Sequence, residues 1–192
     1  MGTNTYNYFD TFSKGGGSWY NERAVEIAIV MDMVRRYQGK NILEIGNVLS
    51  HYFTFKHDVC DKYEAAGGVI TKDVVDFQSD KKYDLIISIS TLEHVGWDES
   101  PRDSMKIPRS IRHLKTIGSK GGLIIITVPL GYNLDLDEIL KHRQIQFAEQ
   151  YQLIRISSGN DWEEVPWKDV QFAKYNSPYP FANALVIGII RL

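Results

Sequence analysis

The spacing of apolar residues along the chain predicts a domain of alternating helices and strands. Apolar residues recur at helical spacing from Glu22 to Gln38, and Gly39 ends that helix. The next apolar segment, Ile42 to Ile45, has the length of a short strand. Two later segments, Tyr83 to Ser90 and Leu123 to Val128, are apolar with almost no alternation. Such runs are typical of strands buried on both faces of a parallel sheet.

Further segments extend this order. Strands are expected at His57–Asp61, Val69–Val75, Leu153–Ser157 and Ala184–Ile190, and helices at Ser104–Ile117 and Asp135–Glu149. We expect the last helix to be capped near Asn133 or Asp135. No helix is evident between the last two strands. The order therefore predicts an α/β fold with a mainly parallel sheet of about seven strands and a C-terminal antiparallel hairpin.

Composition and charge narrow the range of functions. The 192 residues include 22 basic and 24 acidic side chains, so bulk charge offers no support for binding nucleic acid or an anionic membrane. The length suits a single domain over residues 1–192. Cys60 is the only cysteine, which leaves no disulfide framework and no thiolate metal site. Because no apolar run approaches the roughly 20 residues of a membrane span and the start lacks a signal-peptide pattern, a cytoplasmic location is expected.

Aromatic residues gather in two segments outside the predicted elements. The first is an N-terminal arm, residues 1–20, with a flexible joint at residues 15–17. The second is a long loop at residues 158–180, and loops of this length inside compact domains are usually functional. Both segments are expected to hang over the carboxyl edge of the sheet as a lid. The alternative is a homodimer interface, where exposed aromatic residues also concentrate.

The strand at Ile42–Ile45 runs through Glu44 into a turn at Gly46. A glycine at such a turn lets the backbone approach a ligand without a side chain in the way. Loops that leave parallel strands are also where open α/β sheets bind cofactors. We therefore interpret the turn as part of a cofactor site. It contains a single glycine, followed by Val48 and Ser50.

Three segments together resemble the class I S-adenosylmethionine-dependent methyltransferases, a Rossmann-like family. Leu43–Gly46 is similar to the family's first motif, Tyr83–Gly96 to its fourth strand with the following loop, and Gly121–Pro129 to its fifth strand. The segment Tyr83–Gly96 is the closest match. The resemblance covers residues 40–133, and the flanks match only in general layout. It implies a Rossmann-like fold, methyltransferase activity and S-adenosylmethionine as the cofactor.

The resemblance also implies which residues contact the cofactor. Asp61 lies where the family's ribose-binding acid ends the second strand. Asp73 or Asp76 lies in the adenine-contacting turn, a choice that the sequence leaves open. Glu44 either binds the amino group of the cofactor or orients the Gly46 loop by accepting backbone amides. The residues predicted to bind the cofactor are Glu44, Gly46, Ser50, His51, Asp61, Asp73, Asp76 and Ser90.

The first motif departs from the family pattern, in which the positions of Val48 and Ser50 are usually glycine. A valine at positive φ would cost on the order of 1–2 kcal/mol, so we expect this loop to take another path. Either Ser50, His51 and Tyr52 replace the missing contacts with side-chain hydrogen bonds and stacking, or the cofactor site has been lost. We favour the first, because the acids on the cofactor side are all present.

The candidate base for methyl transfer is His94, which follows the fourth strand at the edge where ligands bind. A histidine titrates near neutrality, as a base for an alcohol requires. The alternative is that His94 packs under the adenine or hydrogen-bonds a loop. Asp98 is expected to assist catalysis. The adjacent Asp98 and Glu99 alone are weak support for a cation site, so no metal is expected.

The expected acceptor is a small polar molecule, such as a sugar, a sugar nucleotide or a related metabolite, that is methylated on oxygen. The residues predicted to bind it are Arg23, Trp97, Tyr132, Asn133, Trp162 and Trp167. This hypothesis depends on the aromatic loop, which suits stacking on sugar faces, and on the absence of a basic face. Two alternatives stay open: a non-catalytic cofactor- or nucleotide-binding module, and a structural subunit that docks a partner.

Overall fold

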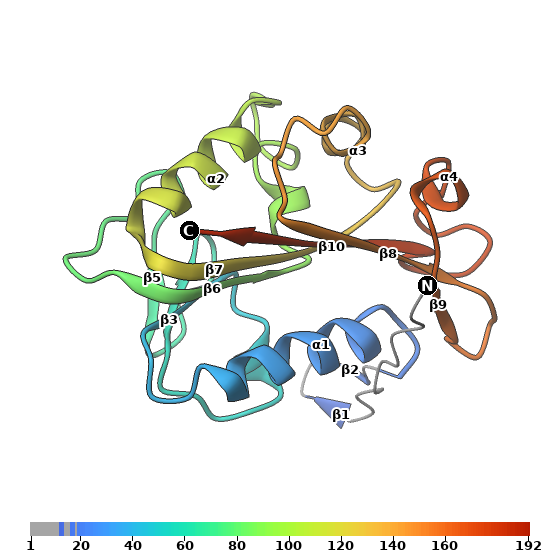
Figure 1. The fold of residues 1–192 in the computed structure, drawn as a ribbon. Helices are drawn as coiled ribbons and strands as arrows, with labels where there is room; N and C mark the ends of the chain where they lie inside the picture. Colours follow the sequence, from blue (N-terminus) through green and yellow to red (C-terminus); the bar gives the residue numbers. More distant parts are fainter. Residues whose placement is uncertain (1–11, 14–15, 18) are drawn as a thin grey trace.

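The structure is a computed structural model that describes residues 12–13, 16–17 and 19–192. Most of the predicted N-terminal arm therefore lies outside the described residues. Of its described part, β1 (Phe12–Ser13) and β2 (Gly16–Gly17) form a short antiparallel pair. The rest of the chain builds an eight-stranded sheet with helices on both faces (Figure 1). No helix within the described ranges is both long enough and apolar enough to cross a membrane.

The large sheet has the strand order β5-β4-β3-β6-β7-β10-β8-β9. The strands β3 to β7 run parallel, whereas β10 is antiparallel to both β7 and β8. The predicted mainly parallel sheet with a C-terminal antiparallel hairpin is therefore confirmed, with an additional strand, β9, at the edge. The bounds are Ile42–Ile45 (β3), Asp58–Asp61 (β4), Val69–Thr71 (β5), Tyr83–Ile89 (β6), Gly118–Pro129 (β7), Glu149–Arg155 (β8), Trp162–Glu164 (β9) and Ala184–Arg191 (β10).

The strand β6 shows why an unbroken apolar run forms a strand here. Leu85 and Ile87 pack in the layer that contains α1 (Arg23–Arg36), whereas Ile86 packs in the layer that contains α2 (Lys106–Ile117). In Figure 1, α3 (Leu134–Lys141) lies on the same face of the sheet as α2, and α1 covers the opposite face. Because both faces are covered, side chains on both sides of a central strand can be apolar.

The predicted helix at Asp135–Glu149 is wrong in its C-terminal half. The helix α3 ends at Lys141, and Glu149 already belongs to β8. Arg143 adopts φ +52°, a left-handed conformation that a helix cannot continue through. The predicted N-terminal cap is confirmed, because Asn133 Oδ1 accepts a hydrogen bond from the Leu136 amide at 3.0 Å.

The predicted loop at residues 158–180 contains β9 and a short helix, α4 (Trp167–Val170). Near its start, the side-chain amide of Asn160 donates to the carbonyl oxygens of Trp19 at 3.0 Å and Asn21 at 2.8 Å. The ring of Tyr20 lies 5.3 Å from that of Phe181. The described end of the arm therefore packs against the C-terminal region. The role of the two segments as a lid stays a prediction.

Candidate functional site

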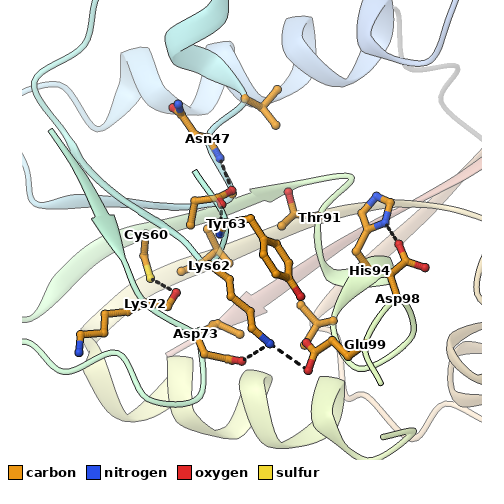
Figure 2. Close-up of a pocket in the computed structure, with 16 residues that line it drawn as sticks. Asn47, Cys60, Lys62, Tyr63, Lys72, Asp73, Thr91, His94, Asp98 and Glu99 are labelled. Carbon is orange, nitrogen blue, oxygen red and sulfur yellow. Dashed lines mark hydrogen bonds and ion pairs between the residues drawn. The ribbon is translucent and has the colours of Figure 1, made fainter. Parts of the chain in front are cut away.

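A cavity of about 340 Å³ lies at the carboxyl edge of the sheet, at the ends of β3, β4, β5 and β6 (Figure 2). The chain passes outward from β3 to β4 and β5, and then returns to β6 on the other side of β3. The cavity thus lies where the strand order reverses, which is where open α/β sheets bind ligands. Its walls are formed by residues 45–48, 60–63, 72–74, 91, 94, 95, 98 and 99.

Gly46 begins the loop after β3 and has φ +83°, a conformation that favours glycine. A Cβ at this position would also overlap the side chain of Thr91. Thr91 follows β6, so the missing side chain at Gly46 lets the loops after β3 and β6 pack closely. Both loops line the cavity. Glycine is therefore required here by backbone conformation and by space.

The rest of this loop avoids the glycine conformation, as expected from its sequence. Val48 has φ −97° and ψ −50°, in the right-handed helical region, and it precedes a short 3₁₀ helix, η1 (Leu49–His51). The carboxylate of Glu44 accepts the backbone amides of Val48 and Leu49, each at 2.8 Å. Its other oxygen lies 2.7 Å from His57 Nε2. Glu44 is fully buried, with both carboxylate oxygens bonded inside the protein. It therefore orients the loop, the second of its two predicted roles.

Ser50, His51 and Tyr52 do not line the cavity. The Ser50 hydroxyl donates to Asn47 Oδ1 at 2.5 Å, and His51 Nε2 lies 3.7 Å from a carboxylate oxygen of Glu64. The loop contributes Asn47 and Val48 to the cavity wall instead. The predicted contacts of Ser50 and His51 with a cofactor are therefore not among those that this cavity offers.

Asp61 ends β4 and lines the cavity. Its Oδ1 accepts the backbone amides of Tyr63 and Glu64, each at 2.8 Å, and its Oδ2 accepts the amide of Asn47 at 3.3 Å. One carboxylate thus connects the loop after β4 with the loop after β3. An acid held in this way stands at a fixed position in the wall, where it can accept hydrogen bonds from a ligand.

The structure distinguishes the two acids that the sequence left as alternatives. Asp73 lines the cavity, whereas Asp76 is exposed and lies outside its walls. The Asp73 carboxylate forms ion pairs with Lys106 Nζ at 2.5 Å and with Lys62 Nζ at 3.0 Å. Burial acts to raise the pKa of Asp73, but the hydrogen bonds from Lys106 and Lys62 outweigh it and lower that pKa. Of the two alternatives, Asp73 is therefore the acid that lines the cavity.

His94 and Asp98 lie together in the cavity wall, and Tyr132, which does not line the cavity, bonds to Asp98. His94 Nδ1 lies 2.5 Å from Asp98 Oδ2, and the Tyr132 hydroxyl donates to the same oxygen at 2.8 Å. The rings of His94 and Tyr132 are 4.8 Å apart in an edge-to-face arrangement. Burial acts to raise the pKa of Asp98, but the hydrogen bonds from His94 and Tyr132 lower it overall. An ionised Asp98 therefore orients the imidazole.

Arg23 lies among three buried glutamates. Its Nη1 donates to Glu26 Oε2 at 3.0 Å, so it pairs with a carboxylate of the protein itself. Glu93 Oε1 lies 3.6 Å from His94 Nε2, and Glu93 Oε2 has no hydrogen-bond partner among the described residues. Burial, reinforced by the charges of Glu26 and Glu22, raises the pKa of Glu93 well above its ordinary value. Burial therefore favours the protonated form of the Glu93 carboxyl.

Comparison with solved structures gives the fold a name. The N-methyltransferase NodS from Bradyrhizobium japonicum WM9, in complex with S-adenosyl-L-homocysteine, superposes with a TM-score of 0.50 at 12% identity, over 84% of each chain. A second structure of NodS gives the same score and identity over 88% of this chain and 95% of that one. The chain has the Rossmann-like methyltransferase fold. No protein-family model matches the sequence, and no curated protein matches it either.

None of the six predicted acceptor residues lines the cavity of this methyltransferase fold, and four of them are held by other parts of the protein. The Trp97 ring stacks with the guanidinium of Arg102 at 3.9 Å. Asn133 is buried, with Oδ1 capping α3 and Nδ2 donating to a backbone carbonyl. Trp162 packs beside a small apolar cluster, and Trp167 packs against the main core. These four side chains are thus engaged within the protein.

Ser90, a predicted cofactor contact, does not line the cavity of this methyltransferase fold. Residues that the sequence analysis did not single out line it instead. Ser90 has its hydroxyl turned to Glu26 Oε1 at 2.6 Å, and the next residue, Thr91, lines the cavity in its place. Lys62 and Tyr63 line it as well. The sequence feature that could have identified Lys62 and Tyr63 is their position directly after Asp61, at the end of β4. Within the described residues, no group of three His, Cys, Asp or Glu side chains is arranged to hold a metal ion.

Proposed function

We propose that the protein is an S-adenosylmethionine-dependent methyltransferase that binds its cofactor in the cavity at the carboxyl edge. The observation that carries this proposal is that one cavity combines the Gly46 turn, the strand-end acid Asp61 and the side chain of His94. The NodS structure of the same fold, determined with S-adenosyl-L-homocysteine, supports this choice of ligand. S-adenosylmethionine supplies a methyl group already activated by its sulfonium.

The residues of the cavity fit the two halves of such a cofactor. Asp61 offers carboxylate oxygens to the ribose hydroxyls, and a hydrogen bond to a charged acceptor contributes about 1.5–3 kcal/mol. The glycine at position 46 lets the loop after β3 pack against Thr91, and both residues line the cavity. Alignment of nucleophile and methyl group can account for roughly 7–11 kcal/mol of a barrier. Holding the cofactor rigidly is therefore a large part of the chemistry.

His94 is the proposed base. Because the ionised Asp98 lies at Nδ1, we infer that Nδ1 carries the proton and that Nε2 is free to take a proton from the acceptor. Tyr132 donates to the same carboxylate oxygen and so fixes Asp98. Burial raises the pKa of the neighbouring Glu93, which favours the protonated form of this carboxyl beside Nε2. The hydrogen bond to Asp98 thus fixes the orientation of the imidazole in the cavity wall.

The proposed acceptor is a small polar molecule, such as a sugar, that is methylated on a hydroxyl oxygen. The ring of Tyr132 lies 4.8 Å from that of His94 and 5.2 Å from that of Tyr175, and the two tyrosines offer aromatic surface for a sugar face. NodS is an N-methyltransferase, so an amine acceptor is the alternative that the test has to include.

Isothermal titration calorimetry with S-adenosylmethionine and S-adenosyl-L-homocysteine tests the proposal. Both should bind, and Asp61→Ala should weaken binding about tenfold or more. Asp76→Ala is the matched control, because Asp76 lies outside the cavity, and it should bind as the unmodified protein does. Absence of both heat and a thermal shift with either ligand would refute the cofactor assignment. Release of S-adenosyl-L-homocysteine in the presence of sugars, sugar nucleotides and amines then identifies the acceptor.

A further inference from the structure

Four charged side chains close one end of the cavity. Lys62 Nζ lies 3.0 Å from Asp73 Oδ2 and 3.0 Å from Glu99 Oε2. Lys106 Nζ lies 2.5 Å from the same oxygen of Asp73 and 2.6 Å from the same oxygen of Glu99. Each carboxylate is thus held by two ammonium groups. Figure 2 shows Lys62 extended across the cavity, with its ammonium between Asp73 and Glu99.

The two lysines differ in how firmly they are held. Lys106 belongs to α2, and its side chain is only 8% exposed. Lys62 follows β4, and its side chain is 35% exposed. If Lys62 moves away, Asp73 and Glu99 both keep Lys106 as a partner. Movement of Lys62 therefore leaves no unpaired carboxylate, which would otherwise carry a large energetic cost.

The ion pairs of Lys62 connect separate parts of the cavity wall. Lys62 follows β4, Asp73 follows β5, and Glu99 lies in the loop that follows β6. All three line the cavity. The aliphatic stem of a lysine can cover an apolar ligand surface while its ammonium stays in a polar environment. The ammonium of Lys62 also lies 5.3 Å from the centre of the exposed Tyr63 ring. Lys62 thus spans the cavity as a bridge that can open.

We propose that Lys62 is a positioning residue that closes this end of the cavity over the bound cofactor, and that its ion pairs with Asp73 and Glu99 limit the rate of cofactor release. This inference rests on the proposed function. The cavity is already present while Lys62 is paired. In this proposal the ligand lies beneath the lysine bridge, so leaving this end of the cavity requires the bridge to break.

The rate of S-adenosyl-L-homocysteine release, measured by stopped-flow displacement, tests this role. S-adenosyl-L-homocysteine carries no net charge, so salt has little direct effect on its attraction to the protein. Lys62→Met keeps an unbranched apolar stem but loses both ion pairs, and release should accelerate about threefold to tenfold. Raising the salt from about 0.05 M to about 0.5 M should accelerate release from the unmodified protein and leave the variant almost unchanged.

Lys115→Met is the matched control, because Lys115 is exposed on α2 away from this cavity and has no ion-pair partner among the described residues. It should release the ligand as the unmodified protein does, and Lys62→Arg should restore most of the slow release. Equal release from Lys62→Met and the unmodified protein would overturn the proposal, and so would a release rate from the unmodified protein that ignores salt. Failure of the unmodified protein to bind S-adenosyl-L-homocysteine would instead refute the proposed function.

Discussion

The carboxylate of Glu44 accepts the backbone amide of Val48 at 2.8 Å. A buried side chain therefore positions this loop, which carries Val48 and Ser50 where the family pattern usually has glycine. The same carboxylate oxygen also accepts the Leu49 amide, and the other oxygen meets His57. The loop can keep a valine because Glu44 fixes it in a right-handed conformation. The carboxylate of Glu44 thus has a structural role at this turn.

Replacement of Glu44 by Gln should lower the free energy of unfolding by about 1–3 kcal/mol, because a neutral amide forms weaker hydrogen bonds to the two loop amides and to His57. Affinity for S-adenosyl-L-homocysteine should fall as well. Urea denaturation and calorimetry measure the two effects. Glu64→Gln is the control, since Glu64 is partly exposed and its ion pair with His51 is long, at 3.7 Å. A Glu44→Gln protein as stable as this control would contradict the structural role.

Two glycine substitutions separate backbone strain from lack of space. Gly46 and Gly68 both have positive φ, +83° and +89°, but only at Gly46 would a Cβ meet another side chain. Gly68→Ala should cost about 1 kcal/mol of stability from strain alone. Gly46→Ala should cost clearly more and should weaken S-adenosyl-L-homocysteine binding, as measured by thermal denaturation and calorimetry. Similar losses for the two variants would show that the contact with Thr91 is unimportant.

The sequence predicts the sheet well wherever burial determines the pattern. Tyr83–Ile89 and the apolar part of β7 have covered faces on both sides, so their apolar runs could be recognised directly. The prediction failed after Lys141, where Ile145 continues the apolar pattern of the helix but is buried in the core from a non-helical segment. An arginine gives no indication of a positive φ, so the end of the helix before Arg143 could not be recognised from the sequence.

The predicted site residues that line the cavity are those at or soon after the ends of strands. Asp61 ends β4, and Asp73, His94 and Asp98 lie in the loops that follow β5 and β6, so all four line the cavity at this edge of the sheet. Side chains further along the loops were harder to place. Trp162 and Trp167 belong to elements that form inside the long loop and pack against the protein. The direction of Lys62 depends on a turn stabilised by Asp61, which residue types alone do not reveal.

Replacement of His94 by Gln should reduce turnover by about 100-fold to 10,000-fold, the usual contribution of a positioned base. Affinity for S-adenosyl-L-homocysteine should change little, because the glutamine preserves a polar side chain in the wall. Steady-state kinetics with the identified acceptor, paired with calorimetry, separate these effects. His142→Gln is the control, since His142 is exposed at the end of α3. A His94→Gln protein with full turnover but weak cofactor binding would assign His94 to binding.

Asp137 should make stability depend on pH between about 4 and 6. Burial, with a smaller contribution from Glu138, raises the pKa of Asp137 from 3.8 to about 6. The folded protein therefore binds a proton more tightly than the unfolded chain, and the unmodified protein loses stability as the pH rises through this window. Asp137→Asn does not titrate and can still accept the Gly131 amide. It should gain on the order of 1–2 kcal/mol over the unmodified protein between pH 4 and pH 7.

Thermal denaturation at a series of pH values measures this gain. Asp135→Asn is the control, because Asp135 is exposed in the first turn of the same helix. Both substitutions remove one negative charge near the helix N-terminus, so their common effect on the helix dipole cancels in the comparison. A pH-independent difference between the two variants would contradict the raised pKa of Asp137.

A crystal structure of the protein with S-adenosyl-L-homocysteine tests the central claim most directly. The account predicts the ligand in the cavity between the Gly46 loop and His94, with its ribose hydroxyls on Asp61 and its adenine toward Asp73, under the side chain of Lys62. A ligand bound elsewhere, or an empty cavity at a concentration that saturates binding in solution, would contradict the assignment of this cavity as the cofactor site.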